Sequence, residues 1–467
     1  MKTKKQFYSK ITFILSLLLI TTIGCERELS EDVVLATYSP SPDVYIDGFS
    51  TGLEYYPYLN SKYEAFSVDT EEKYKGSSSM RFDVPVEGDP AGSYAGAIFR
   101  DDNGGRNLTE YDVLTFWAKA TQSAKINDIG FGQDFGDNKF QVSKQGLQLT
   151  TNWVKYVIPI PDASRLIQEK GMLWYAEGHE NGEGYSFWLD EVKFEKLGTI
   201  SEIQPSILFG EDKVITSFNG VQTTIGGISA NFNFTDQINQ TILISPAYLE
   251  FTSSDTSVAT VDEFGVVTTL NSGSTVITAT FNEVQVSGSL TLNSLGAFSH
   301  APIPTQDPAN VISIFSDSYT NVPVNYYNGY WAPWQTTLSD DFTVEGDNVL
   351  QYTIFNFVGM EYSAPTIDAT SMTHFHLDAY ISGPIAAGRE FRVLLVDFGA
   401  DGSYGGGDDT RHSTTFRAPT LVSQNWISID LPFSSLTGLG SRSNMAQLIL
   451  EGGDGSKIFI DNIYFYN

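Results

Sequence analysis

The sequence predicts an all-β protein assembled from antiparallel β-sandwiches. Three features of the composition support this class: aromatic residues make up 13% of the chain, charged residues make up only 18%, and 41 glycines punctuate it. Apolar runs of strand length alternate with turns rich in Gly, Asp and Asn. Within residues 43–197 only residues 162–170 have a helical pattern. Short strands at regular spacing are typical of sandwiches and barrels.

Residues 1–25 have the pattern of an export signal. Four lysines precede an apolar run, residues 11–24, that is too short to cross a bilayer comfortably. The run ends in TIGC, which resembles the lipobox of bacterial lipoproteins, so we expect Cys25 to be acylated and to become the mature N-terminus. Residues 26–42 predict a flexible, acidic tether of the kind that directs some lipoproteins to the cell surface. A lipid anchor in the outer membrane is therefore expected, and an incidental buried cysteine is the alternative.

The charge of the chain restricts its partners. There are 27 Lys and Arg against 56 Asp and Glu, a net charge of −29. Loss of residues 1–25, which hold four lysines and no acidic residue, leaves a net charge of −33. Such a surface repels phosphate backbones and anionic polysaccharides, so a neutral ligand or a divalent cation is favoured and nucleic acid is not. The single cysteine allows no disulfide, so packing must stabilise the fold.

Three units follow the tether. Strand-like runs at 113–120, 153–160 and 186–197 predict a first sandwich over residues 43–197. Residues 201–295 are rich in Thr, Ser and Val and contain no Trp. Their stretch 253–281 carries S-x-x-x-x-VA-x-V, then G-x-V, then G-x-x-x-I-x-A, and resembles the bacterial immunoglobulin-like group 2 domain, which usually acts as a spacer. A Pro-containing linker, residues 294–308, leads to a third unit over residues 309–467.

The first and third units have the same order of motifs. Each opens with an apolar strand that carries one Asp, VYIDGFS or ISIFSDSY, and continues with an aromatic-rich segment. Each ends on a strand that carries one Asp, WLDEVKF or FIDNIYF. This order resembles the β-jelly-roll carbohydrate-binding modules of the broad kind that includes family 4. The third unit resembles in particular the modules of surface glycan-binding lipoproteins and secreted laminarinases of polysaccharide-foraging gram-negative bacteria.

The resemblance implies two antiparallel β-jelly-roll sandwiches joined by an immunoglobulin-like β-sandwich. It implies a monomeric, non-catalytic surface protein that binds a neutral polysaccharide, either β-1,3-glucan (laminarin) or mixed-linkage β-glucan. The implied partners are an outer-membrane glycan importer complex and the surface glycoside hydrolases of a polysaccharide utilisation system. The alternative is a surface adhesin or structural protein whose aromatic loop docks a protein partner.

Residues 326–337, YYNGYWAPWQTT, place five aromatic rings on a stretch that Gly329 and Pro333 exclude from regular helix or strand. The flat face of Trp or Tyr matches the C–H face of a pyranose, and an aromatic side chain loses few rotamers when it is fixed. Rings on a loop at the mouth of a sandwich therefore predict a carbohydrate platform, and a loop folded back over the core is the alternative. The predicted carbohydrate-binding residues are Trp331, Trp334, Tyr327, Tyr330, Tyr362, Asn356, Tyr404 and Trp174.

Four aspartates predict metal sites. Asp190 and Asp461 interrupt apolar strands, where an isolated carboxylate is costly unless it is paired or bound to metal. Asp47 and Asp317 lie in the first strands, which neighbour the last strands in a jelly roll. Calcium binds such carboxylates together with backbone carbonyls, and the family resemblance also implies a structural calcium. We therefore expect calcium in each jelly roll, and a hydrogen-bonded Asp at a strand end is the alternative.

Two further sets of side chains are not predicted to bind metal or to form the carbohydrate platform. His374 and His376 alternate on one strand face, but no third metal ligand is evident, so a packing or glycan-contact role is favoured. The tryptophans within strand runs are predicted to lie in the cores: Trp117, Trp153, Trp188 and Trp426.

The sequence favours a binding protein over an enzyme. Glycan hydrolysis needs two placed carboxylates. Family 16 laminarinases carry E-x-D-x-x-E on one strand, and the nearest match here, WLDEVK, has Trp188 and Lys193 at the two Glu positions. The acidic residues Glu177, Glu180 and Glu183 lie in a turn-rich segment and predict a solvated loop.

Overall fold

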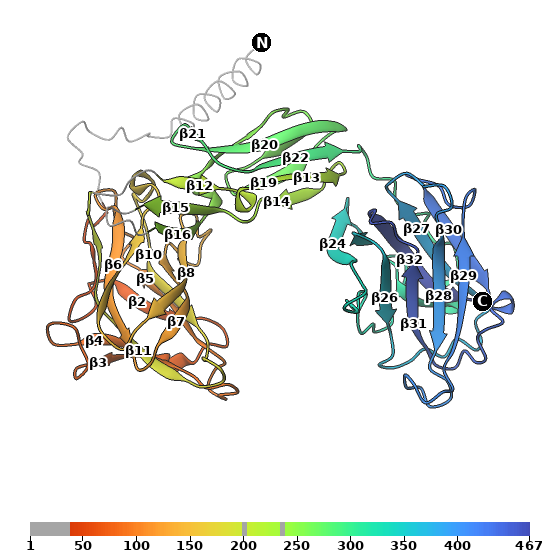
Figure 1. Ribbon diagram of the computed structural model, residues 1–467, viewed down its shortest axis with the longest axis horizontal. Coiled ribbons are helices and arrows are strands. Elements are labelled where there is room, and N and C mark those ends of the chain that lie inside the picture. Colours follow the sequence, from red (N-terminus) through yellow and green to blue (C-terminus); the bar gives the residue numbers. More distant parts are fainter. Residues whose placement is uncertain (1–37, 199–202, 234–238) are drawn as a thin grey trace, which may run out of the picture. The chain divides into compact units, whose positions relative to one another are not determined.

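The computed structural model describes residues 38–198, 203–233 and 239–467 (Figure 1). Cys25, the signal and most of the tether lie outside the described residues. The chain divides into two compact units, residues 1–200 and 201–467. Within the described ranges the regular elements are strands and single 3₁₀ turns, so the fold class is all-β as predicted. None of the helices there is long and apolar enough to cross a membrane.

The N-terminal sandwich contains strands β1 to β11. Their bounds are β1 (Asp43–Tyr45), β2 (Leu53–Pro57), β3 (Phe66–Asp69), β4 (Ser79–Val84), β5 (Ala95–Asp101), β6 (Val113–Ala120), β7 (Ala124–Phe131), β8 (Val142–Leu149), β9 (Val154–Pro159), β10 (Gly171–Glu177) and β11 (Tyr185–Glu195), with 3₁₀ turns η1 (Tyr63–Ala65) and η2 (Ala163–Arg165). One sheet has the order β3-β4-β11-β6-β9 with β1 beside β11, and the second contains β8-β7-β10-β5-β2. The helix predicted at 162–170 is wrong, because only η2 forms there.

Alternation along the strands decides which aromatic residues enter this core. Phe116 is fully buried between the sheets, and its neighbour Trp117 points to the outer face, since successive side chains of a strand alternate. There Trp117 stacks on Tyr74 with ring centroids 3.8 Å apart. The core assignment is therefore wrong for Trp117. It is also wrong for Trp153, which is half-buried and tilted against Tyr74.

The middle region, from residue 204 to 294, contains short strands β12 to β22. Their bounds are β12 (Gln204–Ser206), β13 (Asp212–Ser217), β14 (Gln222–Thr224), β15 (Ser229–Asn233), β16 (Asn239–Ile244), β17 (Glu250–Ser253), β18 (Ala259–Val261), β19 (Val266–Thr269), β20 (Gly273–Phe281), β21 (Val284–Gln285) and β22 (Ser289–Ser294), with 3₁₀ turns η3 (Leu208–Gly210) and η4 (Pro246–Tyr248). Strands β13-β22-β20-β17 form one sheet and β14-β19-β18 another. The β13–β22 pair is parallel, in contrast to the antiparallel pairs around it.

The C-terminal sandwich repeats the topology of the first. Its strands are β23 (Val311–Phe315), β24 (Leu338–Val344), β25 (Asp347–Thr353), β26 (Phe357–Glu361), β27 (His374–Ile381), β28 (Phe391–Asp397), β29 (Thr410–Phe416), β30 (Trp426–Pro432), β31 (Met445–Glu451) and β32 (Ile458–Tyr466), with 3₁₀ turns η5 (Pro308–Asn310) and η6 (Phe433–Ser435). The sheet β24-β25-β32-β27-β30, with β23 beside β32, matches β3-β4-β11-β6-β9 with β1 beside β11. The facing sheet is β26-β31-β28-β29.

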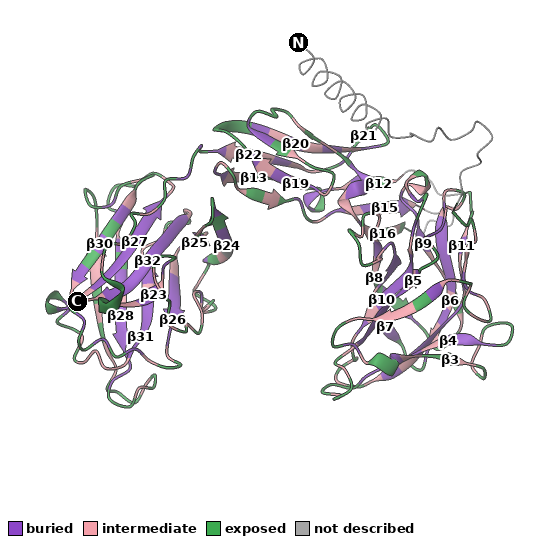
Figure 2. Cartoon of the chain, turned by 180° about the vertical axis from the view of Figure 1, so that it is seen from behind, coloured by how far each residue is buried: buried purple, intermediate pink, exposed green. Residues whose placement is uncertain are grey.

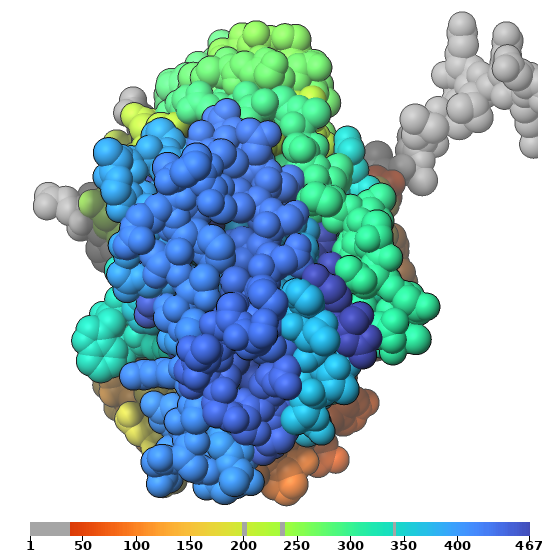
Figure 3. All heavy atoms as spheres, turned by 90° about the vertical axis from the view of Figure 1, so that its right-hand side faces the viewer, coloured from red at the N-terminus to blue at the C-terminus, as the bar shows by residue number. Residues whose placement is uncertain are grey.

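Buried apolar side chains fill the space between these two sheets, and Figure 2 colours their strands largely as buried. Trp426 is half-buried and packs against a smaller apolar cluster around Tyr380 and Phe459. The linker before β23 joins this cluster through Phe298, which is 7% exposed. Asn462 Nδ2 also donates to Pro302 O (3.0 Å). The linker is therefore fixed along the flank of the C-terminal sandwich, which Figure 3 shows with the linker in aquamarine beside the blue surface.

Candidate functional site

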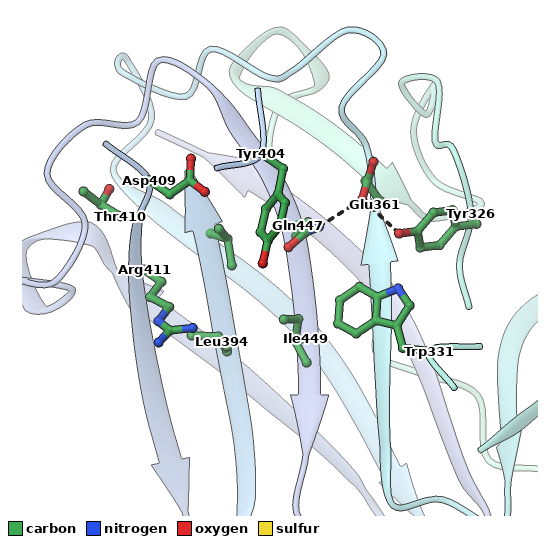
Figure 4. Close-up of a pocket in the computed structure, with 11 residues that line it drawn as sticks. Tyr326, Trp331, Glu361, Leu394, Tyr404, Asp409, Thr410, Arg411, Gln447 and Ile449 are labelled. Carbon is green, nitrogen blue, oxygen red and sulfur yellow. Dashed lines mark hydrogen bonds between the residues drawn. The ribbon is translucent and has the colours of Figure 1, made fainter. Parts of the chain in front are cut away.

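A groove of about 650 Å³ lies on the outer face of the sheet β26-β31-β28-β29 (Figure 4). Eleven residues line it: Tyr326, Trp331, Glu361, Leu394, Val396, Tyr404, Asp409, Thr410, Arg411, Gln447 and Ile449. Figure 4 shows Trp331 on one flank, Arg411 on the other, and Leu394 and Ile449 between them. The groove is therefore an apolar floor bordered by rings and by polar groups.

The floor follows from strands that are apolar on both faces. Leu395 and Leu448 point into the core and are fully buried, and the adjacent Leu394 and Ile449 point the other way, into the groove. A strand with one solvated face normally alternates apolar and polar residues. The apolar outer face of β28 and β31 is therefore a surface suited to contact with another apolar surface.

The aromatic loop is fixed to the edge strand β26. Backbone bonds run from Glu361 N to Tyr326 O (3.0 Å) and from Gly329 N to Gly359 O (3.0 Å). The indole of Trp331 lies against Gly359, where an added Cβ would come within 2.5 Å of Cζ2 of the ring. Glycine at this position allows Trp331 to lie flat against the strand at the border of the groove.

Glu361 anchors the polar side of the groove. Its Oε2 accepts from Tyr326 Oη (2.9 Å) and Gln447 Nε2 (2.9 Å), and its Oε1 accepts from Ser363 Oγ (2.6 Å). Burial acts to raise the pKa of Glu361, but the bonds from Ser363, Gln447 and Tyr326 outweigh it and hold that pKa below its ordinary value. The carboxylate is therefore ionised and committed to positioning its neighbours, which does not suit a general acid.

The Gly-rich loop between β28 and β29 supplies the opposite border. Tyr404 is 78% exposed, and its ring packs against Phe398 with centroids 5.6 Å apart. The loop is braced by its own carboxylates: Asp409 Oδ2 accepts from Gly405 N (2.8 Å), and Asp408 Oδ2 accepts from Ala400 N (2.7 Å). Tyr404 is thus an exposed ring on a braced loop.

The predicted binding residues separate into three groups. Trp331 and Tyr404 line the groove. Tyr330 and Trp334 are 54% and 74% exposed, but they do not line it. Tyr327 packs against the core and donates from Oη to Ile314 O (2.9 Å), so it is a structural residue.

Three further predicted contacts are wrong for a physical reason. Tyr362 is fully buried in the core. Trp174 is 6% exposed, and its Nε1 donates to Val142 O (3.1 Å). Asn356 is occupied within the loop, donating to Trp334 O (2.8 Å) and accepting from Thr336 N (2.9 Å). Each residue lies close to an aromatic segment in the sequence, but its side chain is buried or hydrogen-bonded within the protein.

Several groove residues were missed from the sequence: Tyr326, Glu361, Leu394, Val396, Asp409, Thr410, Arg411, Gln447 and Ile449. One signal could have found part of the floor. The run FRVLLVDF at residues 391–398 is apolar at consecutive positions, which predicts a strand with contacts on both faces.

The aspartates of the N-terminal sandwich bind backbone amides. Asp190 Oδ2 accepts from Tyr74 N (2.8 Å) and Lys75 N (3.1 Å), and Asp47 Oδ1 accepts from Ser78 N (3.2 Å). These bonds fix the turn before β4. The alternative of hydrogen-bonded aspartates therefore describes Asp47 and Asp190 better than a shared calcium does.

The aspartates of the C-terminal sandwich also accept backbone amides, Asp317 Oδ2 from Asn348 N (2.8 Å) and Asp461 Oδ1 from Asn462 N (2.6 Å), but they lie beside a cavity. Asp317 and Asp461 line a second cavity of about 450 Å³ together with Asp347. Burial, with the charges of Asp347, Asp378 and Asp317, raises the pKa of Asp461 to about 7. Over the described residues, no three His, Cys, Asp or Glu side chains are grouped closely enough to hold a metal ion. The acidic surroundings of Asp461 suit a cation, and its ligand set would have to include oxygens of other kinds.

The two histidines have packing roles. His374 stacks on Tyr466 and His376 on Tyr464, with ring centroids 4.9 Å and 4.7 Å apart. His376 Nδ1 also lies 2.9 Å from Asp430 Oδ1. Both rings are thus held on the outer face of β27.

Two family models match parts of the chain. Residues 40–196 match carbohydrate binding domain 30, and residues 234–292 match the bacterial Ig-like domain (group 2). The chain therefore contains a carbohydrate-binding domain and an immunoglobulin-like domain. The matching family is 30, where the sequence was expected to resemble family 4. Neither match reaches the C-terminal sandwich.

Solved structures of carbohydrate-binding modules are also similar. A family 30 module is 16% identical, covering 33% of this chain and 87% of that one, with a TM-score of 0.26. The family 11 module from Clostridium thermocellum, in complex with a β-1,3-1,4-mixed-linked tetrasaccharide, is 18% identical and covers 29% and 85%, with a TM-score of 0.23. A β-1,2-glucanase from Parabacteroides distasonis is 13% identical and covers 57% and 39%, with a TM-score of 0.22. No curated protein sequence matches. At these scores, no ligand or reaction carries over to this chain.

Proposed function

We propose that this protein is a non-catalytic carbohydrate-binding protein that holds a neutral polysaccharide in the groove of its C-terminal sandwich. The observation that carries the proposal is the apolar floor of Leu394 and Ile449 with Trp331 and Tyr404 at its borders. The C–H face of a pyranose packs on such rings, and its hydroxyls remain free at the edges. A volume of about 650 Å³ is within the range of small-ligand sites.

Polar groups at the border of the groove complete the site. Glu361 holds Gln447 and Tyr326 in fixed positions, so their remaining hydrogen-bonding capacity faces the groove already oriented. Fixed polar groups beside an apolar floor are the usual composition of a small-molecule site. They favour a hydroxylated ligand over a protein side chain, which separates this proposal from the adhesin alternative.

The ligand class we propose is a neutral β-glucan, β-1,3-linked or mixed-linkage. The net charge of −29 supports neutrality, and the choice of β-glucan rests on the motif order of the sequence. The family 30 domain supports a second glycan contact in the N-terminal sandwich. Two sites on one chain raise avidity when both reach the same polymer.

Location and partners belong to the same proposal. The TIGC motif at the end of the export signal supports acylation of Cys25 and a lipid anchor at the outer-membrane surface. A monomer that captures polysaccharide there would pass it to a glycan importer complex, and surface glycoside hydrolases would shorten it.

Calcium in the C-terminal sandwich is also proposed. Asp461 and Asp317 would hold it, with Asp347 close by. A bound cation would neutralise carboxylates that otherwise repel one another and would stabilise the fold. Asp190 of the N-terminal sandwich fits less well, because its Oδ2 accepts from Tyr74 N and Lys75 N and its Oδ1 accepts from Glu191 N.

Native gel electrophoresis through polysaccharide tests the proposal. Laminarin, mixed-linkage β-glucan and unrelated neutral and acidic polysaccharides are cast into separate gels. The expected result is slower migration in β-glucan gels and unchanged migration in acidic polysaccharide. Unchanged migration in every gel would overturn the proposed function.

A further inference from the structure

Arg411 has no side-chain partner in the part of the chain that the structure describes. Every other arginine there is ion-paired or hydrogen-bonded: Arg81, Arg100, Arg106, Arg165, Arg389, Arg392, Arg417 and Arg442. In a chain with more than twice as many acidic as basic residues, an unpaired guanidinium is unexpected. It lines the groove, and it is exposed to solvent there.

Asp409, in the same wall of the groove, has a carboxylate oxygen that accepts no hydrogen bond. Its Oδ2 accepts from Gly405 N (2.8 Å), whereas its Oδ1 is shielded from solvent and has no partner. A shielded carboxylate oxygen without a hydrogen bond is costly. Asp409 and Arg411 both line the groove, because residues two apart on an extended chain point to the same side. The two side chains nevertheless form no ion pair with each other. The wall thus presents a set of unpaired donors beside a carboxylate whose Oδ1 has no partner and is closed to solvent.

The guanidinium is selective for paired acceptors. Its planar fork donates two parallel bonds to two oxygens that lie close together. A carboxylate offers such a pair, but Asp409 and Glu361 line the groove and would repel an acidic sugar. Two hydroxyls on adjacent ring carbons also offer such a pair, and one of them can donate to the Asp409 carboxylate once a turn of that side chain exposes its Oδ1.

We propose that Arg411 and Asp409 form a subsite that reads adjacent free hydroxyls on a neutral sugar ring packed beside Tyr404. An internal 4-linked β-glucose carries such hydroxyls at C2 and C3. An internal 3-linked β-glucose has free hydroxyls at C2, C4 and C6, so no two are adjacent. The subsite therefore selects glucan that contains 4-linked residues, which makes mixed-linkage β-glucan a better ligand than pure β-1,3-glucan. This inference rests on the proposed function.

Calorimetric titration of the full mature chain with two probes tests the subsite. The probes are soluble mixed-linkage β-glucan and a linear β-1,3-glucan of similar length, both long enough that terminal rings, which carry adjacent hydroxyls in either polymer, are few. For the wild type, tighter binding of the mixed-linkage probe is expected. Replacement R411A, and separately D409N, should weaken binding of that probe about 10-fold and change binding of the β-1,3 probe by less than about 3-fold. Arg417 is paired with Glu390 away from the groove, so R417A is the charge-matched control and should change neither.

The outcomes separate the two proposals. Equal losses on both probes in R411A, or no loss, would overturn the hydroxyl-reading subsite while the proposed function stands. Tighter binding of a carboxymethylated glucan that R411A abolishes would show that Arg411 reads a carboxylate, which also overturns it. If the wild type binds neither probe, the proposed function itself is contradicted.

Discussion

The indole of Trp331 lies against the backbone of Gly359, with no room for a Cβ between them. Trp331 comes from an irregular loop, whereas Gly359 is in the middle of β26. The strand therefore sets the position of the ring that borders the groove. A ring fixed before the ligand arrives loses less entropy on binding, which is the energetic value of this contact.

Replacement of Gly359 by alanine tests that contact. The new methyl would come 2.5 Å from Cζ2 of Trp331 and must displace the rigid ring. We expect β-glucan affinity to fall about 10-fold in calorimetric titration. Gly383 of the same sandwich has room for a methyl and lies outside the groove, so G383A is the matched control and should bind normally. Normal binding by G359A would mean that the position of Trp331 does not matter.

The two tryptophans of the aromatic loop should differ. Trp331 lines the groove, whereas Trp334 is 74% exposed outside it. W331A should lower affinity at least about 10-fold, and W334A less than about 3-fold. Retardation in polysaccharide gels measures both, with far-ultraviolet circular dichroism to verify folding. A larger loss from W334A would place the ligand on the exposed side of the loop and contradict the site described above.

Calcium should stabilise the C-terminal sandwich. Because Asp461 is buried among acidic residues, a cation there should raise the melting temperature by about 5 °C, and a chelator should reverse the gain. D461N should abolish the gain. D190N should keep it, because both oxygens of Asp190 already accept backbone amides. If neither calcium nor the chelator changes the melting temperature of the wild type, the proposed calcium site is contradicted.

Stability of the N-terminal sandwich should fall as pH rises. Glu169 is 7% exposed, and burial raises its pKa to about 7. A carboxyl group with a raised folded pKa contributes stability below its unfolded pKa, and that contribution is lost as pH rises through the folded value. The loss from Glu169 between about pH 4 and about pH 8 is about 3 kcal/mol.

Urea unfolding of E169Q and of the wild type across this pH range measures the effect. Glutamine can still accept from the amides of Lys170 and Gly171, so E169Q should fold normally. Its stability should depend less steeply on pH than that of the wild type. Burial also raises the pKa of Glu177 to about 7, so the stability of E169Q should still depend on pH to some extent. Identical pH profiles would show that Glu169 does not titrate in this range.

The sequence predicted the architecture better than the site. Strand spacing and motif order identify two related sandwiches because they depend on local patterns, and the matching strand orders agree with that reading. The direction in which a side chain points is not determined by the neighbouring residues in the sequence. Tyr362 and Tyr404 both lie near glycine-containing stretches, and yet the first is in the core and the second is on the surface.

Contacts between distant strands explain the residues that were missed. Gln447 is on β31 and Arg411 on β29, and only the sheet order brings them to one groove with Trp331. Likewise, Asp190 is as isolated in the sequence as Asp461. Both carboxylates accept the amide of the next residue, and Asp190 also accepts the amides of Tyr74 and Lys75. Those two amides belong to a turn that strand patterns do not specify.

Calorimetric titration of W331A/Y404A with mixed-linkage β-glucan tests the central claim most directly. Both rings border the groove and neither lies in the core, so the double variant should keep the wild-type melting temperature. The account predicts that its C-terminal site loses measurable affinity for β-glucan. Unchanged affinity in a folded double variant would contradict the claim that this groove holds the glycan.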